Sequence, residues 1–224
     1  MISENLREVR QEIQKSCALV SRSEEDVTLV AVTKSVDAGA TKAIVAAGVF
    51  HLAENRADKF LLKKQLFLDF PEIQWHFIGN LQRRKVKSIV NEIDFLHSLD
   101  NLNLAEEIQK RANKVLKCFV EVNVSGEASK QGISPEELAD FIAKLAAYDK
   151  IKVVGLMTMA PAVATVPEQH QLFRRLRELR DEIHNQKLSW APCTELSMGM
   201  SHDYQAAIQE GATFVRIGTV LFKE

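Results

Sequence analysis

A lysine follows a short apolar run near the start of the chain, and its position suggests amine chemistry. Lys34 comes directly after Leu29-Val30-Ala31-Val32-Thr33, a run typical of a strand that is buried on both faces, as in a parallel sheet. A lysine at the end of a strand commonly extends into water, which is the simpler interpretation. The alternative is an amine in a partly dry site that condenses with an aldehyde to form a Schiff base. The strand alone leaves both interpretations open.

Residues suited to binding a phosphate lie near the end of the chain. Ser201 precedes a predicted helix, whose free N–H groups and dipole favour an anion. Gly218 lets the backbone approach an anion closely, and Thr219 adds a hydroxyl. These residues also have simpler interpretations: Ser201-His202-Asp203 as only a helix cap, and Arg216 as half of a structural ion pair. A phosphate site opposite Lys34 is the geometry that a phosphorylated aldehyde requires.

Other common kinds of site are not indicated by the sequence. The histidines have no metal-ligand spacing, and His76 and His97 lie inside apolar runs, where core histidines with satisfied hydrogen bonds are the simpler interpretation. The three cysteines, Cys17, Cys118 and Cys193, are far apart, which argues against disulfides and zinc and favours a reducing cytoplasm. The chain contains no Gly-x-Ser-x-Gly nucleophile elbow and no Walker loop.

Strand and helix patterns alternate along the whole chain, and this alternation predicts the fold. An amphipathic helix with apolar residues from Ile2 to Val20 comes first. Strands are expected at residues 29–33, 49–53, 75–78, 93–97, 116–122, 152–157, 195–197 and 213–217. Strict alternation of eight strands with helices predicts a single α/β domain over residues 1–224, a (β/α)8 TIM barrel. The rival is a doubly wound open sheet, whose dinucleotide-binding form needs a Gly-x-Gly-x-x-Gly turn that this chain lacks.

The barrel prediction decides where the outer helices and the active face should lie. The chain ends too soon after the last strand for an eighth full helix, so we expect the N-terminal helix to complete the outer ring. Polar residues at the carboxyl ends of the strands should form the active face; they are Lys34, Glu54-Asn55, Asn80, Asn123, residues 197–203 and residues 216–219. Such barrels commonly bind phosphate at strands seven and eight. We therefore expect Lys34 and the candidate phosphate site to share one pocket.

Composition and charge exclude several classes of partner. The net charge is −1, and the basic run Arg83-Arg84-Lys85-Val86-Lys87 is short and typical of a solvated helix face, so we expect no nucleic-acid partner. No apolar run approaches the ~20 residues of a membrane span, and the first residues lack the apolar core of a signal peptide. We expect a cytoplasmic monomer without a membrane partner.

Seven stretches, taken together and in order, carry a specific resemblance. They are Val30–Lys34, Glu54-Asn55, His76–Gly79 with Leu81-Gln82, Glu121–Val124, Gly155–Thr158, Leu196–Ser201 and Val215–Thr219. The chain resembles the pyridoxal phosphate homeostasis proteins, which share the barrel of the alanine racemase N-terminal domain. One departure concerns the tail: family members usually end in Phe-Gly followed by arginine, whereas this chain reads Phe222-Lys223-Glu224.

The resemblance implies pyridoxal 5′-phosphate (PLP) as the cofactor and assigns roles to six residues. Lys34 forms the internal aldimine with PLP, Arg216 faces the pyridine nitrogen, and Asn55 lines the pocket. Ser201, Gly218 and Thr219 bind the phosphate. The resemblance also implies a cytoplasmic protein of vitamin B6 homeostasis that is not an enzyme, has no catalytic residues and no metal, and has PLP-dependent apo-enzymes as candidate recipients.

Two enzyme hypotheses remain beside this one. The first is a PLP-dependent amino-acid racemase of the alanine racemase type, and the second is a Schiff-base aldolase that uses Lys34 without a cofactor. Racemisation requires two positioned acid–base groups. In alanine racemases the second group is a tyrosine from a separate C-terminal domain. The only tyrosines here are Tyr148 and Tyr204. We expect neither to reach the reacting carbon, so we expect a poor racemase or none.

Overall fold

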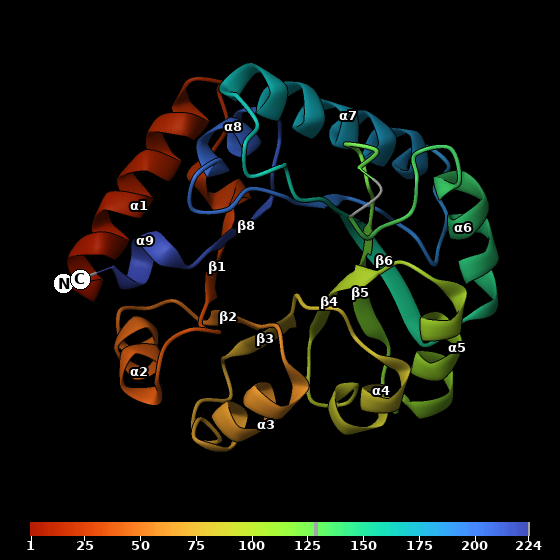
Figure 1. Ribbon diagram of the computed structural model, residues 1–224, viewed down its shortest axis with the longest axis horizontal. Coiled ribbons are helices and arrows are strands. Elements are labelled where there is room, and N and C mark those ends of the chain that lie inside the picture. Colours follow the sequence, from red (N-terminus) through yellow and green to blue (C-terminus); the bar gives the residue numbers. More distant parts are fainter. Residues whose placement is uncertain (128–129, 224) are drawn as a thin grey trace.

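A closed barrel of eight parallel strands forms the centre of the computed structural model, which describes residues 1–127 and 130–223. Each strand pairs with the next in the sequence, and the last returns to pair with the first (Figure 1). The strands are β1 Thr28–Val32, β2 His51–Glu54, β3 Gln74–Phe77, β4 Phe95–Leu99, β5 Leu116–Glu121, β6 Ile151–Met157, β7 Glu195–Ser197 and β8 Phe214–Ile217. This closed strand order confirms the predicted TIM barrel. The alternative prediction, a doubly wound open sheet, is wrong.

Helices cover the outside of the barrel (Figure 1). They are α1 Ile2–Ala18, α2 Ala38–Ala46, α3 Ala57–Gln65, α4 Arg83–Ile89, α5 Leu102–Arg111, α6 Leu138–Lys144, α7 Val166–His184, α8 Tyr204–Gln209 and α9 Thr219–Phe222, with short 3-10 turns at Glu24–Asp26 and Leu145–Ala147. Their apolar residues recur at helical spacing, as on α7, where Leu172, Leu176, Leu179 and Ile183 are buried. Among the described residues, no helix has both the length and the apolar character needed to cross a membrane.

Side chains alternate along each strand between two apolar layers. The outward side chains pack against the helices in the larger layer. The inward side chains fill the barrel in a smaller layer of Val30, Val32, Ala53, Phe95, Phe119, Met157 and Phe214. The barrel is therefore a packed core and not a channel, and the strand ends above it are held rigidly.

The N-terminal helix completes the outer ring, as the sequence predicts. Helix α1 packs against α8, α9 and α2, and α9 is a single turn of four residues. The buried side chain of Asn5 on α1 donates hydrogen bonds to the carbonyl oxygens of Leu221 at 3.1 Å and Lys223 at 2.9 Å. The first helix thus joins the end of the chain and covers the side of the barrel between β8 and β1.

Replacing Asn5 should test this connection. Asn5→Ala removes two hydrogen bonds to carbonyl groups at the end of α9. Leaving one buried carbonyl group without its hydrogen-bond donor costs about 1–3 kcal/mol. We expect the free energy of unfolding in urea to fall by about that amount. Ser3→Ala, at an exposed position of the same helix, is the control. An equal loss in the two variants would contradict a joining role for Asn5.

Candidate functional site

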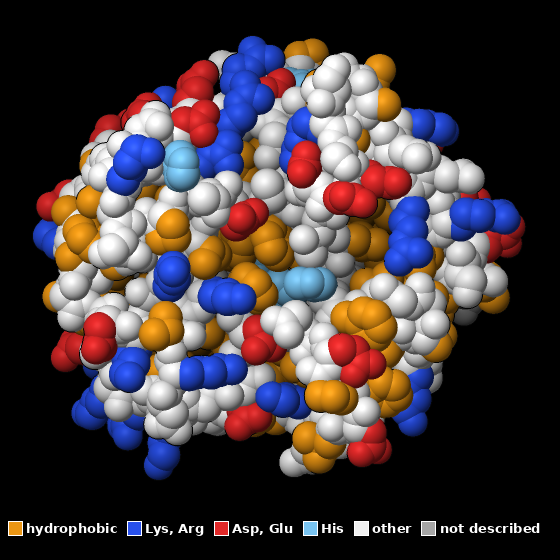
Figure 2. Space-filling view, turned by 180° about the vertical axis from the view of Figure 1, so that it is seen from behind, with side chains coloured by type: hydrophobic (Ala, Val, Ile, Leu, Met, Phe, Trp, Pro, Cys, Tyr) orange, Lys and Arg blue, Asp and Glu red, His pale blue; other side chains and the backbone are white. Residues whose placement is uncertain are grey.

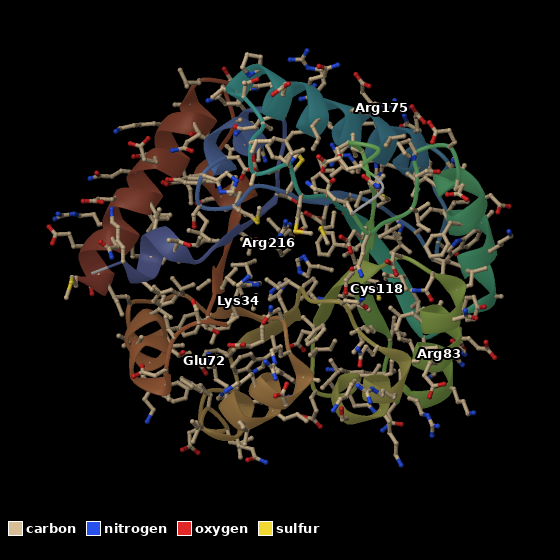
Figure 3. All side chains as sticks on the ribbon, viewed as in Figure 1. Lys34, Glu72, Arg83, Cys118, Arg175 and Arg216 are labelled. Atoms are coloured by element: carbon tan, nitrogen blue, oxygen red, sulfur yellow. The ribbon has the colours of Figure 1, made fainter. Side chains whose placement is uncertain are left out.

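The cofactor residues that the resemblance implies line one cavity at the carboxyl ends of the strands. The cavity has a volume of about 410 Å³, and its lining includes Lys34, Asn55, Ser201, Arg216, Gly218 and Thr219. Figure 3 shows Lys34 and Arg216 near the middle of the ring of strands, whereas Arg83 and Arg175 lie out on the helices. The fold therefore brings together residues that are up to 185 positions apart in the sequence, from Lys34 to Thr219.

A buried ion pair fixes the backbone on which Lys34 stands. Glu54 Oε1, at the end of β2, accepts hydrogen bonds from Thr33 Oγ1 and from Lys63 Nζ, each at 2.6 Å. Lys63 Nζ also donates to the carbonyl oxygens of Thr33 at 2.6 Å and Val36 at 3.1 Å. The amine of Lys63 is thus committed to structure. Lys34 is exposed and makes no hydrogen bond or ion pair within the described parts of the chain.

Ser201 links the two loops of the predicted phosphate site, which are the loop between β7 and α8 and the loop between β8 and α9. We call Ser201, Gly218 and Thr219 the phosphate corner. Its Oγ accepts from the N–H of Gly218 at 3.3 Å and of Val220 at 3.5 Å, distances at the long limit for hydrogen bonds. The residue at the N-cap position of α8 is Asp203; its Oδ1 accepts from the N–H of Met200 at 2.5 Å and makes no capping hydrogen bond to the helix. Of Ser201-His202-Asp203, it is Asp203 that stands at the N-cap position, whereas the Ser201 hydroxyl faces the β8–α9 loop. The interpretation of the three residues as only a helix cap therefore does not hold for Ser201.

Gly218 permits the close approach of that loop to the first strand. A Cβ atom at this position would lie 3.2 Å from the carbonyl oxygen of Val32 and 3.3 Å from Val32 Cβ, which is tighter than side chains normally pack. Thr219 follows on the cavity wall. The corner thus offers two hydroxyl groups and backbone N–H groups beside a residue with no side chain, a set of donors suited to a phosphate.

Arg216 is buried beside the cavity and is held by neutral groups. Its Nη1 donates to Ser197 Oγ at 2.6 Å and its Nη2 to the carbonyl oxygen of Thr158 at 3.1 Å. No ion pair involves it in the part of the chain that the structure describes, so the ion-pair interpretation is wrong. Burial lowers the pKa of Arg216 to about 10, while Asp203 and Glu121 act in the opposite direction. The guanidinium is therefore charged at neutral pH.

Asn55 is placed by a close contact with the loop after β3. A Cβ atom at Gly79 would lie only 2.1 Å from the carbonyl oxygen of Asn55, so only glycine lets the two strand ends meet here. Asn55 lines the cavity, whereas the adjacent Glu54 is fully buried in the ion pair with Lys63. Neighbouring residues of one motif thus have separate roles, one at the site and one beneath it.

Glu121 is a cavity residue that was not predicted as a site residue, although it belongs to one of the seven stretches that carry the family resemblance. It ends β5, is 4% exposed and lines the same cavity as Lys34. Burial, and secondarily Asp100, raise the pKa of Glu121 to about 7, while Arg216 lowers it. A carboxylate directly after the buried apolar residues Cys118-Phe119-Val120 was the available signal. The cavity thus holds a group that can gain or lose a proton near neutral pH.

The remaining candidates lie away from the cavity. Tyr204 is buried within α8, Tyr148 follows a short 3-10 turn, and neither lines the cavity. Phe222 and Lys223 of the divergent tail are also absent from its lining, and Glu224 lies outside the described residues. Over residues 1–127 and 130–223, no group of three or more His, Cys, Asp or Glu side chains could hold a metal ion.

Comparisons with known proteins point to one family. Residues 1–224 match the family described as alanine racemase, N-terminal domain. A pyridoxal phosphate homeostasis protein from Aquifex aeolicus (strain VF5) is 42% identical over 224 residues, covering 99% of this chain and 97% of that protein. The solved structure of PipY from Synechococcus elongatus PCC7942 with PLP bound has a TM-score of 0.85 at 32% identity, covering 99% of this chain and 100% of PipY.

A more distant likeness concerns the fold alone. The alanine racemase of Clostridium difficile 630 has a TM-score of 0.72 at 19% identity, and the match covers 99% of this chain but only 57% of the racemase chain. The barrel is therefore common to both proteins, while the racemase has a large further part that the match does not include.

Proposed function

The chain belongs to the alanine racemase N-terminal domain family and, within it, to the pyridoxal phosphate homeostasis proteins, and from this premise we propose that it binds PLP and serves vitamin B6 homeostasis. We propose further that Lys34 holds PLP as a Schiff base. One observation carries the proposal: the amine of Lys34 and the donors of Ser201, Gly218 and Thr219 line a single cavity. The PLP-bound structure of PipY, a relative over nearly the whole chain, supports it.

The residues of the cavity fit the groups of PLP. When bound, PLP supplies an electrophilic aldehyde that condenses with primary amines. Lys34 is the amine that the cavity offers, and the hydroxyls of Ser201 and Thr219 with the backbone at Gly218 suit the phosphate. Arg216 presents a buried positive charge, which disfavours protonation of a neighbouring pyridine nitrogen and so weakens the ring as an electron sink. Asn55 completes the lining between β2 and β3.

A carrier role agrees with these features better than a committed catalyst. The curated relative is named for homeostasis and not for a reaction. The proposal includes PLP-dependent apo-enzymes as recipients and a monomer that acts in the cytoplasm, all of which rest on the family resemblance. Titration of cofactor-free protein with PLP should give a new visible absorbance band that borohydride reduction fixes covalently. A protein that gives no such band would favour the cofactor-independent aldolase hypothesis.

One observation keeps a weak amino-acid racemase as the second candidate. Racemisation needs an acid–base group on each face of the reacting carbon. Neither tyrosine lines the cavity, but Glu121 does, and its pKa is raised to about 7. The charge of Arg216 works against this chemistry. We therefore expect any such activity to be slow.

Exchange of the α-hydrogen of amino acids separates the two candidates. PLP-loaded protein incubated with L-alanine in deuterated water should leave the α-hydrogen and the L configuration unchanged, as followed by NMR and chiral chromatography. Glu121→Gln, which removes the proton-transfer group at nearly constant volume, is the matched variant. Repeated turnover that depends on Lys34 and is lost in Glu121→Gln would contradict the carrier proposal and establish the racemase.

A further inference from the structure

Three histidines form a continuous line through the barrel, and the proposed function does not use them. His51 Nδ1 lies 2.9 Å from His76 Nε2, and His76 Nδ1 lies 2.8 Å from His97 Nε2. His97 Nδ1 lies 2.8 Å from Ser197 Oγ, which accepts a hydrogen bond from Arg216 Nη1 at 2.6 Å. We call His51, His76, His97 and Ser197 the histidine chain. It ends at the arginine of the cofactor cavity.

The register of the strands explains why the histidines meet. His51 pairs with Gln74, two residues before His76, and His76 pairs with Phe95, two residues before His97. Inward-facing side chains recur every two residues along a strand. Each step from β2 to β3 to β4 therefore moves one inward position toward the carboxyl ends of the strands. The histidine chain therefore runs diagonally through the barrel, from the face at the amino ends of the strands to the cavity at their carboxyl ends.

The surroundings keep the middle of the histidine chain dry and neutral. His76 and His97 are fully buried, and burial lowers the pKa of each well below its ordinary value. Phe95 stacks on His76 with ring centroids 4.5 Å apart, and Phe119 stacks on His97 at 4.4 Å. Water is thus excluded from the sides of the line, and both imidazoles are uncharged at physiological pH.

The other end of the histidine chain reaches the surface. His51 is partly exposed and lines a cavity with Arg10, Glu24 and Glu72. Burial lowers the pKa of His51, with Asp94 raising it and Lys117 lowering it. Figure 2, the view from behind, shows an exposed histidine side chain near its centre with hydrophobic side chains around it. The line therefore connects solvent at one face with Arg216 near the other.

The tautomers of neutral imidazoles that are hydrogen-bonded in such a line depend on one another. Each ring has one N–H donor and one acceptor nitrogen, and each contact needs one hydrogen. When the hydroxyl of Ser197 donates to His97 Nδ1, His97 must donate through Nε2 to His76, and His76 through Nε2 to His51. The opposite order puts the hydrogen on every Nδ1. A mixed order leaves a buried contact with two hydrogens or with none, which is costly.

Arg216 selects between the two orders. Its Nη1–H group donates to Ser197 Oγ, so the hydroxyl hydrogen is left to donate elsewhere. Within the described residues, His97 Nδ1 is the acceptor at hydrogen-bonding distance. This fixes the hydrogen on Nε2 of His97, and through the contacts on Nε2 of His76 and His51.

We propose that the histidine chain acts as one proton-ordered unit, which positions Arg216 and couples the cofactor cavity to the opposite face of the barrel. Ser197 and His97 are positioning residues: they hold the guanidinium with neutral partners, so that its charge remains directed at the cavity. A change at the Arg216 end shifts the tautomers of all three histidines together. His51, which does not touch the cavity, registers that change.

Side-chain NMR of protein with ¹⁵N- and ¹³C-labelled histidine tests the proposal. The nitrogen shifts should show that His51, His76 and His97 carry their hydrogen on Nε2. Ser197→Ala removes the ordering group and should change the tautomer populations at His51 and His76 as well as His97. Ser197→Thr, which keeps a hydroxyl, should restore the wild-type pattern. The proposal would be overturned if Ser197→Ala affected His97 alone, or if the histidines of the wild-type protein showed mixed tautomers.

A matched variant and a ligand separate ordering from packing. Phe119→Leu disturbs the ring that stacks on His97 without removing a hydrogen bond, and it should leave His51 unchanged. Adding PLP should shift the nitrogen resonances of His51 in the wild-type protein but not in Ser197→Ala. This ligand experiment rests on the proposed function. If PLP does not bind, the absorbance band is absent and the proposed function fails, whereas the Ser197 variants still decide the present inference; PLP binding without a response at His51 overturns the coupling.

Discussion

Lys34→Ala should abolish covalent retention of PLP. The variant lacks the amine that the cavity offers to the aldehyde, and the nearby Lys63 is committed to Glu54 and to the carbonyl groups of Thr33 and Val36. We expect no visible absorbance band on titration with PLP and no borohydride-stable adduct by mass spectrometry. The fold should survive because the side chain of Lys34 is exposed, and circular dichroism can verify this.

The control for this experiment is another exposed lysine close in sequence. Lys42 lies on α2 at an exposed position, and Lys42→Ala should retain both the band and the adduct. A reducible adduct of wild-type yield in Lys34→Ala would show that a different lysine carries the aldehyde. In that case peptide mapping of the reduced protein would identify the lysine, and the assignment of Lys34 would be wrong.

Removing both hydroxyls of the phosphate corner should weaken PLP binding by orders of magnitude. Hydrogen bonds to a charged group contribute roughly 1.5–3 kcal/mol each. The double variant Ser201→Ala with Thr219→Val therefore loses about 3–6 kcal/mol if the two effects add. Since about 1.4 kcal/mol corresponds to a factor of ten, the dissociation constant should rise by roughly two to four orders of magnitude.

Pyridoxal, which lacks the phosphate, provides the matched ligand for this measurement. Its affinity should change little between the wild-type protein and the double variant, because the hydroxyls of Ser201 and Thr219 have no phosphate to bind. The comparison separates loss of phosphate binding from general damage to the cavity. Equal weakening for both ligands, or an unchanged dissociation constant for PLP, would place the phosphate elsewhere.

The sequence by itself determined the fold and the face on which the site should lie. Apolar runs such as Leu29–Val32 alternate with segments of helical periodicity, and each segment shows its pattern independently of its neighbours. Parallel strands of a barrel end at one common face. For this reason Lys34, Ser201 and Gly218-Thr219 could be placed together before their distances were known.

Some boundaries and roles needed more than the local pattern. Strand β4 runs from Phe95 to Leu99 and not over residues 93–97 as expected, since pairing with β3 and β5 sets its extent. Ser201 lies just before a helix, as a cap residue would, but its hydroxyl faces Gly218, and the residue at the N-cap position is Asp203. Lys34 and Lys63 are both lysines near the active face, and only the contact of Lys63 with Glu54 separates their roles.

The electrostatics of the interior were decided by the tertiary structure alone. The pKa of Glu121 depends on its burial and on Asp100, which comes from the end of another strand. His76 and His97 read in the sequence as separate core histidines, and each does lie in the core. They are joined to His51 by hydrogen bonds only because of the relative register of β2, β3 and β4. The contact of His97 with Ser197 also requires that β7 places this serine across the barrel. Register is a relation between strands that closure of the barrel imposes, so no single stretch of sequence contains it.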